Sequence, residues 1–251
     1  FNAIDSVPLT AIAFFMLTGE LMTSATITDR LVALSRALIG RIRGGLAQVN
    51  VLVSMFFAGM NGSVVADTAT VGALVLPAMK KAGYPAAFSA AVTGVSSTIG
   101  GIIPPSIMMI VLANSTEISI AALFAAGIIP GVLIGVVIMI INHYFAIKYN
   151  FERSDEPFSI RRAGKELYRS SFALLIPLVL VGSVMGGVAS VVEAGAITAM
   201  VALLTGVFVY RTIKWKECTG AFRRAFRNSA MVFIIIAASG PFSWLLTSLG
   251  A

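Results

Sequence analysis

Long hydrophobic runs without a charged side chain dominate the chain, and they predict helices that cross a membrane. Runs that lack Asp, Glu, Lys and Arg occupy residues 82–116, 118–147, 170–192 and 228–251. A helix needs about 20 consecutive apolar residues to cross the hydrocarbon core, so each run is long enough. Another apolar helix is expected at about residues 7–26. The pattern therefore predicts an all-α polytopic membrane protein.

Composition supports the same fold class. Hydrophobic residues make up 58% of the 251 residues and charged residues 12%, whereas a soluble domain carries about 25% charged residues. The net charge of +7 is typical of cationic cytoplasmic loops, and we expect no nucleic-acid partner. With one histidine and one cysteine, no transition-metal site is expected. Because the chain begins at Phe1 and ends in an apolar run, we expect a fragment of a longer protein.

The positions of the 18 Lys and Arg residues predict which helix ends face the cytoplasm. All of them fall in four groups, at residues 30–43, 80–81, 148–169 and 211–227. Because cytoplasmic loops are enriched in Lys and Arg, all four groups are expected on the cytoplasmic side. The first is expected to lie along the membrane interface as a basic amphipathic segment. The third and fourth are expected to be cytoplasmic loops.

Residues 44–81 are apolar but carry cations at both ends, which does not fit a single crossing. We therefore predict a re-entrant helical hairpin that enters and leaves on the cytoplasmic side. Its middle, residues 58–63, has the Gly, Asn and Ser of a turn. Each arm of about 15 residues would reach about 22 Å, short of the roughly 30 Å hydrocarbon core. Two ordinary short spans are the alternative.

A second break is predicted within residues 96–106, which read SSTIGGIIPPS. The prolines remove two amide donors and the glycines allow unusual dihedral angles. Broken backbone at membrane depth must line a protein or water cavity. In secondary transporters the C-terminal ends of half-helices coordinate Na⁺, and their N-terminal ends attract carboxylates. We therefore predict a Na⁺ site between the two breaks, with the second half-helix facing a substrate carboxylate.

The candidate site residues come from these two breaks. The predicted Na⁺-binding residues are Asn61, Gly62, Ser63, Ser96, Ser97, Thr98, Gly100 and Gly101. The predicted substrate-binding residues are Ser63, Asp67, Pro104, Pro105 and Ser106. For any single Ser or Thr, a hydrogen bond to a carbonyl of its own helix is the alternative role.

Carboxylates in or near apolar runs are costly and often functional. Asp67 lies one helical turn beyond the predicted hairpin tip, where it could assist cation binding or simply hydrogen-bond the hairpin. Glu193 lies where two spans meet, and a structural role is expected. Glu20 is expected to pair with a basic side chain. The chain has no phosphate-binding Walker motif and no nucleophile elbow. An intramembrane enzyme, suggested only by Asp67 with Ser63 and Thr68, is therefore a remote alternative.

Three segments carry a family resemblance. They read GGLAQVNVLVSMFFAGMNGSVVADTATVGALVLPAMKKAGYPAAFSAAV at 44–92, GGIIPPSIMMIV at 100–111 and LFAAGIIPG at 123–131. Together they resemble the large membrane subunit of tripartite ATP-independent periplasmic (TRAP) transporters. One departure is the run from Ser190 to Ala194, where the family often has a Thr-Pro-Thr-Glu-Ala-like sequence.

The resemblance implies an inverted-repeat, elevator-type transporter in which each repeat contributes a re-entrant helical hairpin and a broken helix. It implies Na⁺-driven uptake of a C4-dicarboxylate, sialic acid or similar organic acid across a bacterial or archaeal inner membrane, with no cofactor besides Na⁺ as coupling ion. The implied partners are a small membrane subunit and a periplasmic substrate-binding protein. A one-component Na⁺- or H⁺-coupled carrier of a related hairpin group is the alternative.

The expected organisation follows from the pattern and the resemblance together. It comprises a first transmembrane helix with a basic arm (1–43), the hairpin (44–81), a broken helix with its return helix (82–147), a cytoplasmic loop (148–169) and the truncated start of a second repeat (170–251).

Overall fold

The computed structural model describes residues 6–39, 42–151 and 159–249, and the regular secondary structure in these parts is helical, without a strand. The elements in order are α1 (Val7–Ser24), α2 (Ile27–Ile39), α3 (Gly45–Asn61), α4 (Val64–Lys81), α5 (Ala86–Ser97), the 3-10 helix η1 (Thr98–Gly101), α6 (Ile107–Thr116), α7 (Ile120–Lys148), α8 (Ile160–Met185), α9 (Val191–Leu204), the π-helical turn η2 (Thr205–Val209) and α10 (Trp215–Ser248). Within the described parts, five helices are long and apolar enough to cross a membrane: α1, α7, α8, α9 with η2, and α10. The prediction of an all-α polytopic membrane protein is confirmed.

Helices α3 and α4 form a helical hairpin with a two-residue turn. Gly62 ends α3 in the left-handed region, with φ 61°, where glycine is favoured because it has no Cβ. Ser63 then adopts an extended conformation and caps α4, its hydroxyl accepting a hydrogen bond from the amide of Ala66 at 3.3 Å. The predicted turn within residues 58–63 is therefore present. Entry and exit on one side of the membrane stay a prediction.

The helix through residues 86–116 is interrupted, as its glycines and prolines predict. Helix α5 ends at Ser97, η1 continues to Gly101, and α6 begins only after Pro104 and Pro105, which are joined by a cis peptide bond. Ser106 caps α6 by accepting from the amide of Met109 at 3.3 Å. Its hydroxyl also donates to the carbonyl of Gly101 at 2.7 Å, so one side chain joins the two halves of the break.

Helix α7 packs closely against the break because one of its faces carries glycine at every fourth position. A Cβ on Gly127 would lie 2.4 Å from the carbonyl oxygen of Ile102. A Cβ on Gly131 would lie 2.4 Å from the side chain of Ile103, and one on Gly135 would lie 2.5 Å from Sδ of Met55. Such stripes of small residues let helices approach closely in membranes.

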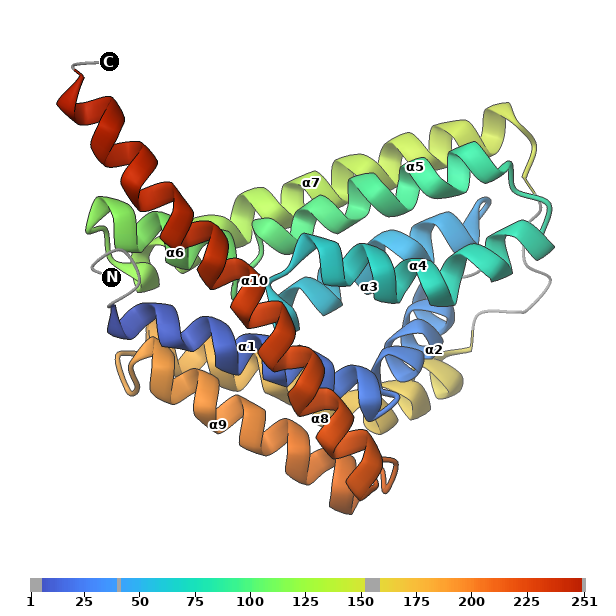
Figure 1. Cartoon of the computed structure of the whole chain (residues 1–251). Helices are drawn as coiled ribbons and strands as arrows, with labels where there is room; N and C mark the ends of the chain where they lie inside the picture. Colours follow the sequence, from blue (N-terminus) through green and yellow to red (C-terminus); the bar gives the residue numbers. More distant parts are fainter. Residues whose placement is uncertain (1–5, 40–41, 152–158, 250–251) are drawn as a thin grey trace.

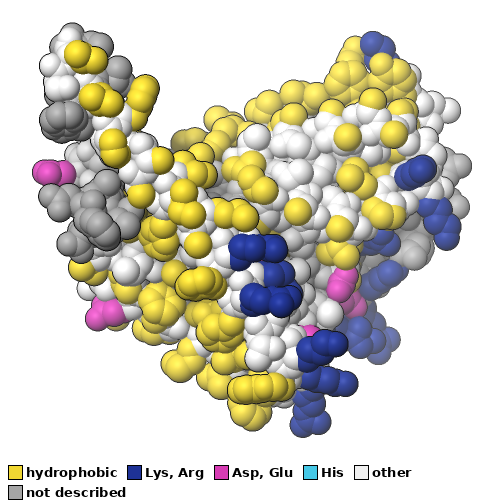
Figure 2. All heavy atoms as spheres, viewed as in Figure 1, with side chains coloured by type: hydrophobic (Ala, Val, Ile, Leu, Met, Phe, Trp, Pro, Cys, Tyr) yellow, Lys and Arg dark blue, Asp and Glu magenta, His cyan; other side chains and the backbone are white. Residues whose placement is uncertain are grey.

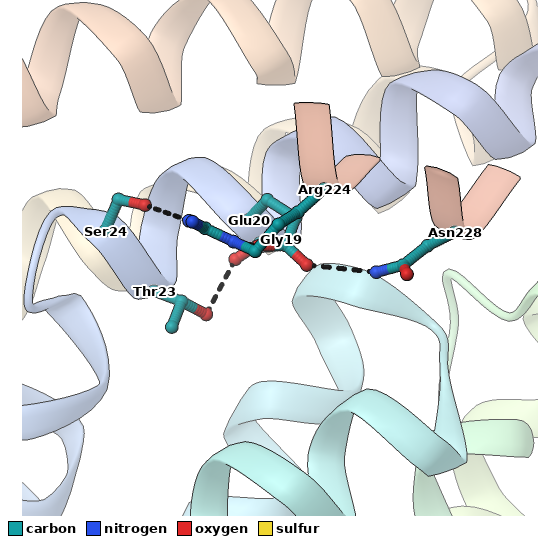
Figure 3. Close-up of polar contacts among 6 residues, drawn as sticks. All are labelled: Gly19, Glu20, Thr23, Ser24, Arg224 and Asn228. Atoms are coloured by element: carbon teal, nitrogen blue, oxygen red, sulfur yellow. Dashed lines mark hydrogen bonds and ion pairs between the residues drawn. The ribbon is translucent and has the colours of Figure 1, made fainter. Parts of the chain in front are cut away.

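Helix α1 packs against α9, α10 and α3. Figure 1 shows α10 crossing α1 and extending beyond the other helices toward the C-terminus. In Figure 3 the carboxylate of Glu20 accepts from Arg224 Nε at 2.6 Å and from Asn228 Nδ2 at 3.1 Å. Arg224 also donates to Ser24 at 2.9 Å. The expectation that Glu20 pairs with a basic side chain is confirmed, and the pair joins the first and last helices of the chain.

Two boundaries differ from the prediction. Helix α8 begins at Ile160, so residues 160–169 of the expected cytoplasmic loop are helical. Helix α10 begins at Trp215, so most of the expected loop at 211–227 is helical as well. Ala221, Ala225 and Ser229 are buried at four-residue spacing, whereas Arg223 and Arg227 are exposed. The charges therefore mark the exposed face of a helix rather than a loop.

The surface is apolar over large areas, as expected for helices that face lipid. Exposed hydrophobic side chains follow α7, among them Ile129, Leu133 and Ile140, and α10, among them Ile234 and Ile235. Figure 2 shows Lys and Arg over the centre and right-hand side of one face, and none visible at its left-hand side. This asymmetry agrees with cations gathered toward one side of a membrane.

Candidate functional site

The tip of the α3–α4 hairpin lies against the break between η1 and α6. The amide of Ile107 donates to the carbonyl of Gly62 at 3.2 Å. A Cβ on Gly62 would lie 2.5 Å from the carbonyl oxygen of Pro105 and 3.0 Å from Cα of Ser106. A Cβ on Gly100 would lie 3.7 Å from the amide nitrogen of Val64. The two predicted breaks therefore meet, and they do so backbone to backbone.

Four helix ends converge at this contact. The N-termini of α4 and α6, capped by Ser63 and Ser106, meet where Gly62 touches the start of α6. The C-terminal end of α3 and η1, which follows α5, meet beside them. Helix N-termini carry partial positive charge and free N–H groups, and C-termini carry partial negative charge and free carbonyls. The arrangement can thus hold an anion and a cation next to each other without a charged side chain.

The predicted Na⁺-binding residues nearest the tip come together. Asn61 is buried, and its side-chain oxygen accepts a hydrogen bond from the amide of Ser63 at 3.1 Å. Ser63 is half-buried. A Cβ on Gly101 would lie 3.3 Å from Cγ2 of Val64, the residue that follows Ser63. We call Asn61, Gly62, Ser63, Gly100, Gly101 and Ser106 the tip cluster.

Ser96 and Ser97 instead hydrogen-bond within a second polar cluster, between α3 and α5. The Oγ atoms of Ser96 and Ser54 are 3.3 Å apart, and Ser96 also donates to the side-chain oxygen of Asn50 at 3.3 Å. Asn50 Nδ2 donates to the hydroxyl of Thr93 at 2.7 Å, and Ser97 donates to the carbonyl of Thr93 at 2.8 Å. All of these side chains are buried. We call Asn50, Ser54, Asp67, Thr93, Ser96 and Ser97 the inner cluster.

Asp67 belongs to the inner cluster. Its side chain is fully buried, and the hydroxyls of Ser97 and Ser54 are the polar groups that interact with it. Neither carboxylate oxygen has a partner of hydrogen-bond distance and angle among the described residues. Both roles that the sequence suggests for Asp67, assisting cation binding and hydrogen-bonding the hairpin, stay predictions.

Other candidate residues have local roles. Thr98 is exposed, and its hydroxyl donates to the carbonyl of Val95 within its own helical turn at 2.7 Å. Glu193 forms a capping box with Ser190, accepting from the Ser190 amide at 2.8 Å, which agrees with the structural role expected of it. Within the described residues, no three His, Cys, Asp or Glu side chains come together as metal ligands.

Sequence reasoning missed Asn50, Ser54 and Thr93. The signal was present, because Asn50 and Ser54 are four residues apart in an apolar helix, and Thr93, Ser96 and Ser97 have the same three- and four-residue spacing. Such spacing places polar side chains on one helix face. Two helices with matching polar faces would have pointed to a buried network.

The family model of the tripartite ATP-independent periplasmic transporter, DctM component, matches residues 1–251. The chain is 34% identical over 248 residues to the C4-dicarboxylate TRAP transporter large permease protein DctM of Pseudomonas aeruginosa, covering 99% of this chain and 58% of that protein. It is 32% identical to the sialic acid TRAP transporter large permease protein SiaM of Vibrio cholerae, covering 98% and 57%. It is 34% identical to the 2,3-diketo-L-gulonate TRAP transporter large permease protein YiaN of Escherichia coli, covering 98% and 58%. The chain thus spans less than two thirds of the length of these relatives.

Proposed function

Because the chain belongs to the family of DctM components of tripartite ATP-independent periplasmic transporters, we propose that it is part of a secondary transporter that couples Na⁺ to the uptake of an organic acid. The observation that carries the proposal is the contact between the hairpin tip at Gly62 and the helix break at Pro105–Ser106. Costly breaks at membrane depth serve binding rather than scaffolding. The proposed location is the inner membrane of a bacterial or archaeal cell.

The tip cluster supplies the chemistry that Na⁺ requires. Na⁺ is a hard cation that prefers oxygen ligands, and the C-terminal ends of α3 and η1 bring backbone carbonyls to the tip. The Ser63 hydroxyl accepts from Ala66, and the lone pair that remains can face an ion. Neutral ligands of this kind bind a cation weakly enough for it to leave again, as a transport cycle demands.

The N-termini of α4 and α6 supply the complementary anion site. Each presents backbone N–H groups at the tip, beside Ser63 and Ser106, and helix N-termini attract carboxylates. The relatives named above are called transporters of C4-dicarboxylate, sialic acid and 2,3-diketo-L-gulonate. A carboxylate is the group that these substrates share, so the proposed substrate class is an organic acid.

The movement and the partners are proposed on the basis of family membership. We propose that the α3–α4 hairpin is re-entrant and that an elevator-type movement carries the tip and the break together across the membrane. The proposed partners are a small membrane subunit and a periplasmic substrate-binding protein, which is consistent with a tripartite periplasmic transporter. A one-component carrier would use the same site without the binding protein.

The intramembrane-enzyme alternative gains no support. Thr68, its candidate hydroxyl neighbour, is exposed and donates to the carbonyl of Val64 at 2.9 Å, whereas Asp67 is fully buried. Adjacent in sequence, the two side chains lie in different environments and cannot act as a nucleophile and its base. The relatives named above are permeases.

The experiment that tests the proposal is uptake into proteoliposomes that contain the full-length protein and its small membrane subunit. Labelled organic acids are offered with and without an inward Na⁺ gradient, and with and without the cognate binding protein. Uptake that needs both the Na⁺ gradient and the binding protein is expected. Uptake without the binding protein would favour the one-component carrier, and uptake driven equally well by K⁺ would overturn the Na⁺ coupling.

A further inference from the structure

A groove runs between α1 and α10, and we call it the α1–α10 groove. Its volume is about 510 Å³, within the range of about 300–1,000 Å³ that is typical of ligand sites. Every lining residue except Ser229 is apolar, and the hydroxyl oxygen of Ser229 is buried. The large side chains of the lining are Phe14, Leu17, Phe222, Phe226, Phe233 and Ile234. Such a surface favours an apolar occupant.

The length of the groove matches one leaflet of a bilayer. On α10 the lining extends from Phe222 to Ile234, which is about 18 Å at 1.5 Å per residue. The hydrocarbon core is roughly 30 Å thick, and each leaflet contributes about half of it. A partner helix packed along α10 would have contacts across the whole core, whereas an acyl chain of one leaflet has the length of the groove.

Two arginines continue the groove toward the start of α10. Arg223 and Arg227 precede Ala230 and Ile234, which line the groove, at successive spacings of four, three and four residues. Such spacing places all four residues on one face of the helix. Both arginines are exposed. In Figure 2, cationic side chains over α10 lie beside exposed hydrophobic ones. One helix face therefore presents cations first and an apolar groove after them.

These two arginines have no carboxylate partner in the described parts of the chain. Glu20, the acidic residue that α1 presents to α10, is paired with Arg224, which leaves Arg223 and Arg227 without an ion pair among the described residues. Like charges four residues apart on a helix repel each other. An anion bound between the two guanidinium groups would remove that repulsion, and arginine binds phosphate oxygens well.

We propose that the α1–α10 groove binds an acyl chain of an anionic phospholipid, with the lipid phosphate against Arg223 and Arg227. The lipid comes from the cytoplasmic leaflet, because the basic groups of the chain are predicted to face the cytoplasm and this leaflet has a negative surface potential. A phospholipid carries an anionic head and an apolar chain in the order in which α10 presents their partners. The inference concerns the contact of α10 with the membrane and does not depend on the transported acid or the coupling ion.

The test of the headgroup site is native mass spectrometry of the full-length protein with its small subunit. The complex is stripped of lipid in detergent and titrated with phosphatidylglycerol or with phosphatidylcholine of the same acyl chains. We expect one phosphatidylglycerol per chain to bind more tightly than phosphatidylcholine. The double variant Arg223→Gln, Arg227→Gln should weaken this binding by about tenfold or more and remove the preference.

The matched control for the headgroup site is the double variant Arg161→Gln, Lys165→Gln. These two cations are also exposed and four residues apart, but they lie on α8 and outside the groove. The control variant removes the same charge from the protein and should bind phosphatidylglycerol as the wild type does. An equal loss of affinity in both double variants would mean that net charge alone attracts the lipid, and it would overturn the site.

The place of the acyl chain is tested with Ala230→Phe. Ala230 lines the groove and is half-buried, so a phenyl ring there occupies the space of the chain. We expect this variant to lose affinity for phosphatidylglycerol and for phosphatidylcholine. Met231→Phe is the matched control, because Met231 is the next residue, is 55% exposed and does not line the groove. It should bind both lipids as the wild type does.

The remaining outcomes overturn the inference. Unchanged binding of phosphatidylglycerol to Arg223→Gln, Arg227→Gln would show that the phosphate lies elsewhere, and unchanged binding to Ala230→Phe would show that the chain does. If Ala230→Phe instead releases the small subunit, a helix of that subunit fills the groove. If Ala230→Phe lowers the unfolding temperature equally with and without phosphatidylglycerol, a segment of the protein itself fills it.

Discussion

Gly62 lies so close to Pro105 that a Cβ atom on Gly62 would stand 2.5 Å from the Pro105 carbonyl oxygen. Gly62 is also in the left-handed region, with φ 61°. Two separate requirements, backbone conformation and backbone contact, therefore select glycine at the hairpin tip. Any larger residue would have to push the tip away from the start of α6, where the proposed ion and substrate sites meet.

We predict that Gly62→Ala lowers stability and abolishes uptake. A non-glycine residue in this conformation costs about 1 kcal/mol, and the displaced contact adds to that. Gly83→Ala is the matched control, because Gly83 has φ 80° but no atom within 4 Å of its Cβ position. Thermal unfolding and proteoliposome uptake are measured for both. Equal effects of the two substitutions would show that the contact with Pro105 does not matter.

The glycines of α7 allow a graded test of packing against the break. In Gly127→Ala the new methyl group meets the backbone carbonyl of Ile102, which cannot move without moving the break. In Gly135→Ala it meets the side chain of Met55, which can change rotamer. We therefore expect Gly127→Ala to cost about 1–3 kcal/mol, the range for overpacking, and Gly135→Ala clearly less. Unfolding midpoints in the reverse order would contradict this view of the α7 contact.

The ion pair between Glu20 and Arg224 is expected to stabilise the contact of α1 with α10. The Glu20 side chain is 18% exposed and the Arg224 side chain 43%, and Asn228 supports the same carboxylate. A double-mutant cycle with Glu20→Gln and Arg224→Gln should give a coupling free energy of about 1 kcal/mol. The pair of Glu166 and Arg169 on α8 is the control, and about 0.3 kcal/mol is expected there. A coupling no larger than in the control would mean that other contacts hold α10.

Much of the local structure could be predicted because the residues that interrupt the helices can be recognised in the sequence. Asn61-Gly62-Ser63 and the run from Gly100 to Ser106 contain the residues that end helices and begin them again, and the structure places both breaks there. Capping by Ser63 and Ser106 follows from the same local chemistry. These features depend on neighbours in sequence, which a single sequence displays.

Features that depend on partners distant in sequence could not be predicted. Glu20 and Arg224 are 204 residues apart, and the pattern indicates that Glu20 needs a cation but not which one. Ser96 and Ser97 are close in sequence to the break at Gly100, which predicts a place at the site, yet the rotation of α5 turns Ser96 toward Asn50 and Ser54. The start of α10 could not be predicted because the many arginines of this segment favour a loop. The small residues that recur there at four-residue spacing indicate a helix, but their signal is weaker.

We predict finally that Ser63→Ala weakens Na⁺ binding while leaving recognition by the binding protein intact. The substitution removes the one hydroxyl of the hairpin turn and also the cap of α4, worth about 1 kcal/mol. Ser119→Ala controls for the lost cap, because Ser119 caps α7 in the same way and lies outside the tip cluster. Ser63→Thr, which keeps a hydroxyl, should retain most of the affinity. The readout is the Na⁺ concentration that gives half-maximal uptake, with affinity for the binding protein measured separately. If Ser63→Ala and Ser119→Ala have the same Na⁺ dependence, Ser63 contributes only a helix cap, and the tip must bind the ion through backbone carbonyls alone.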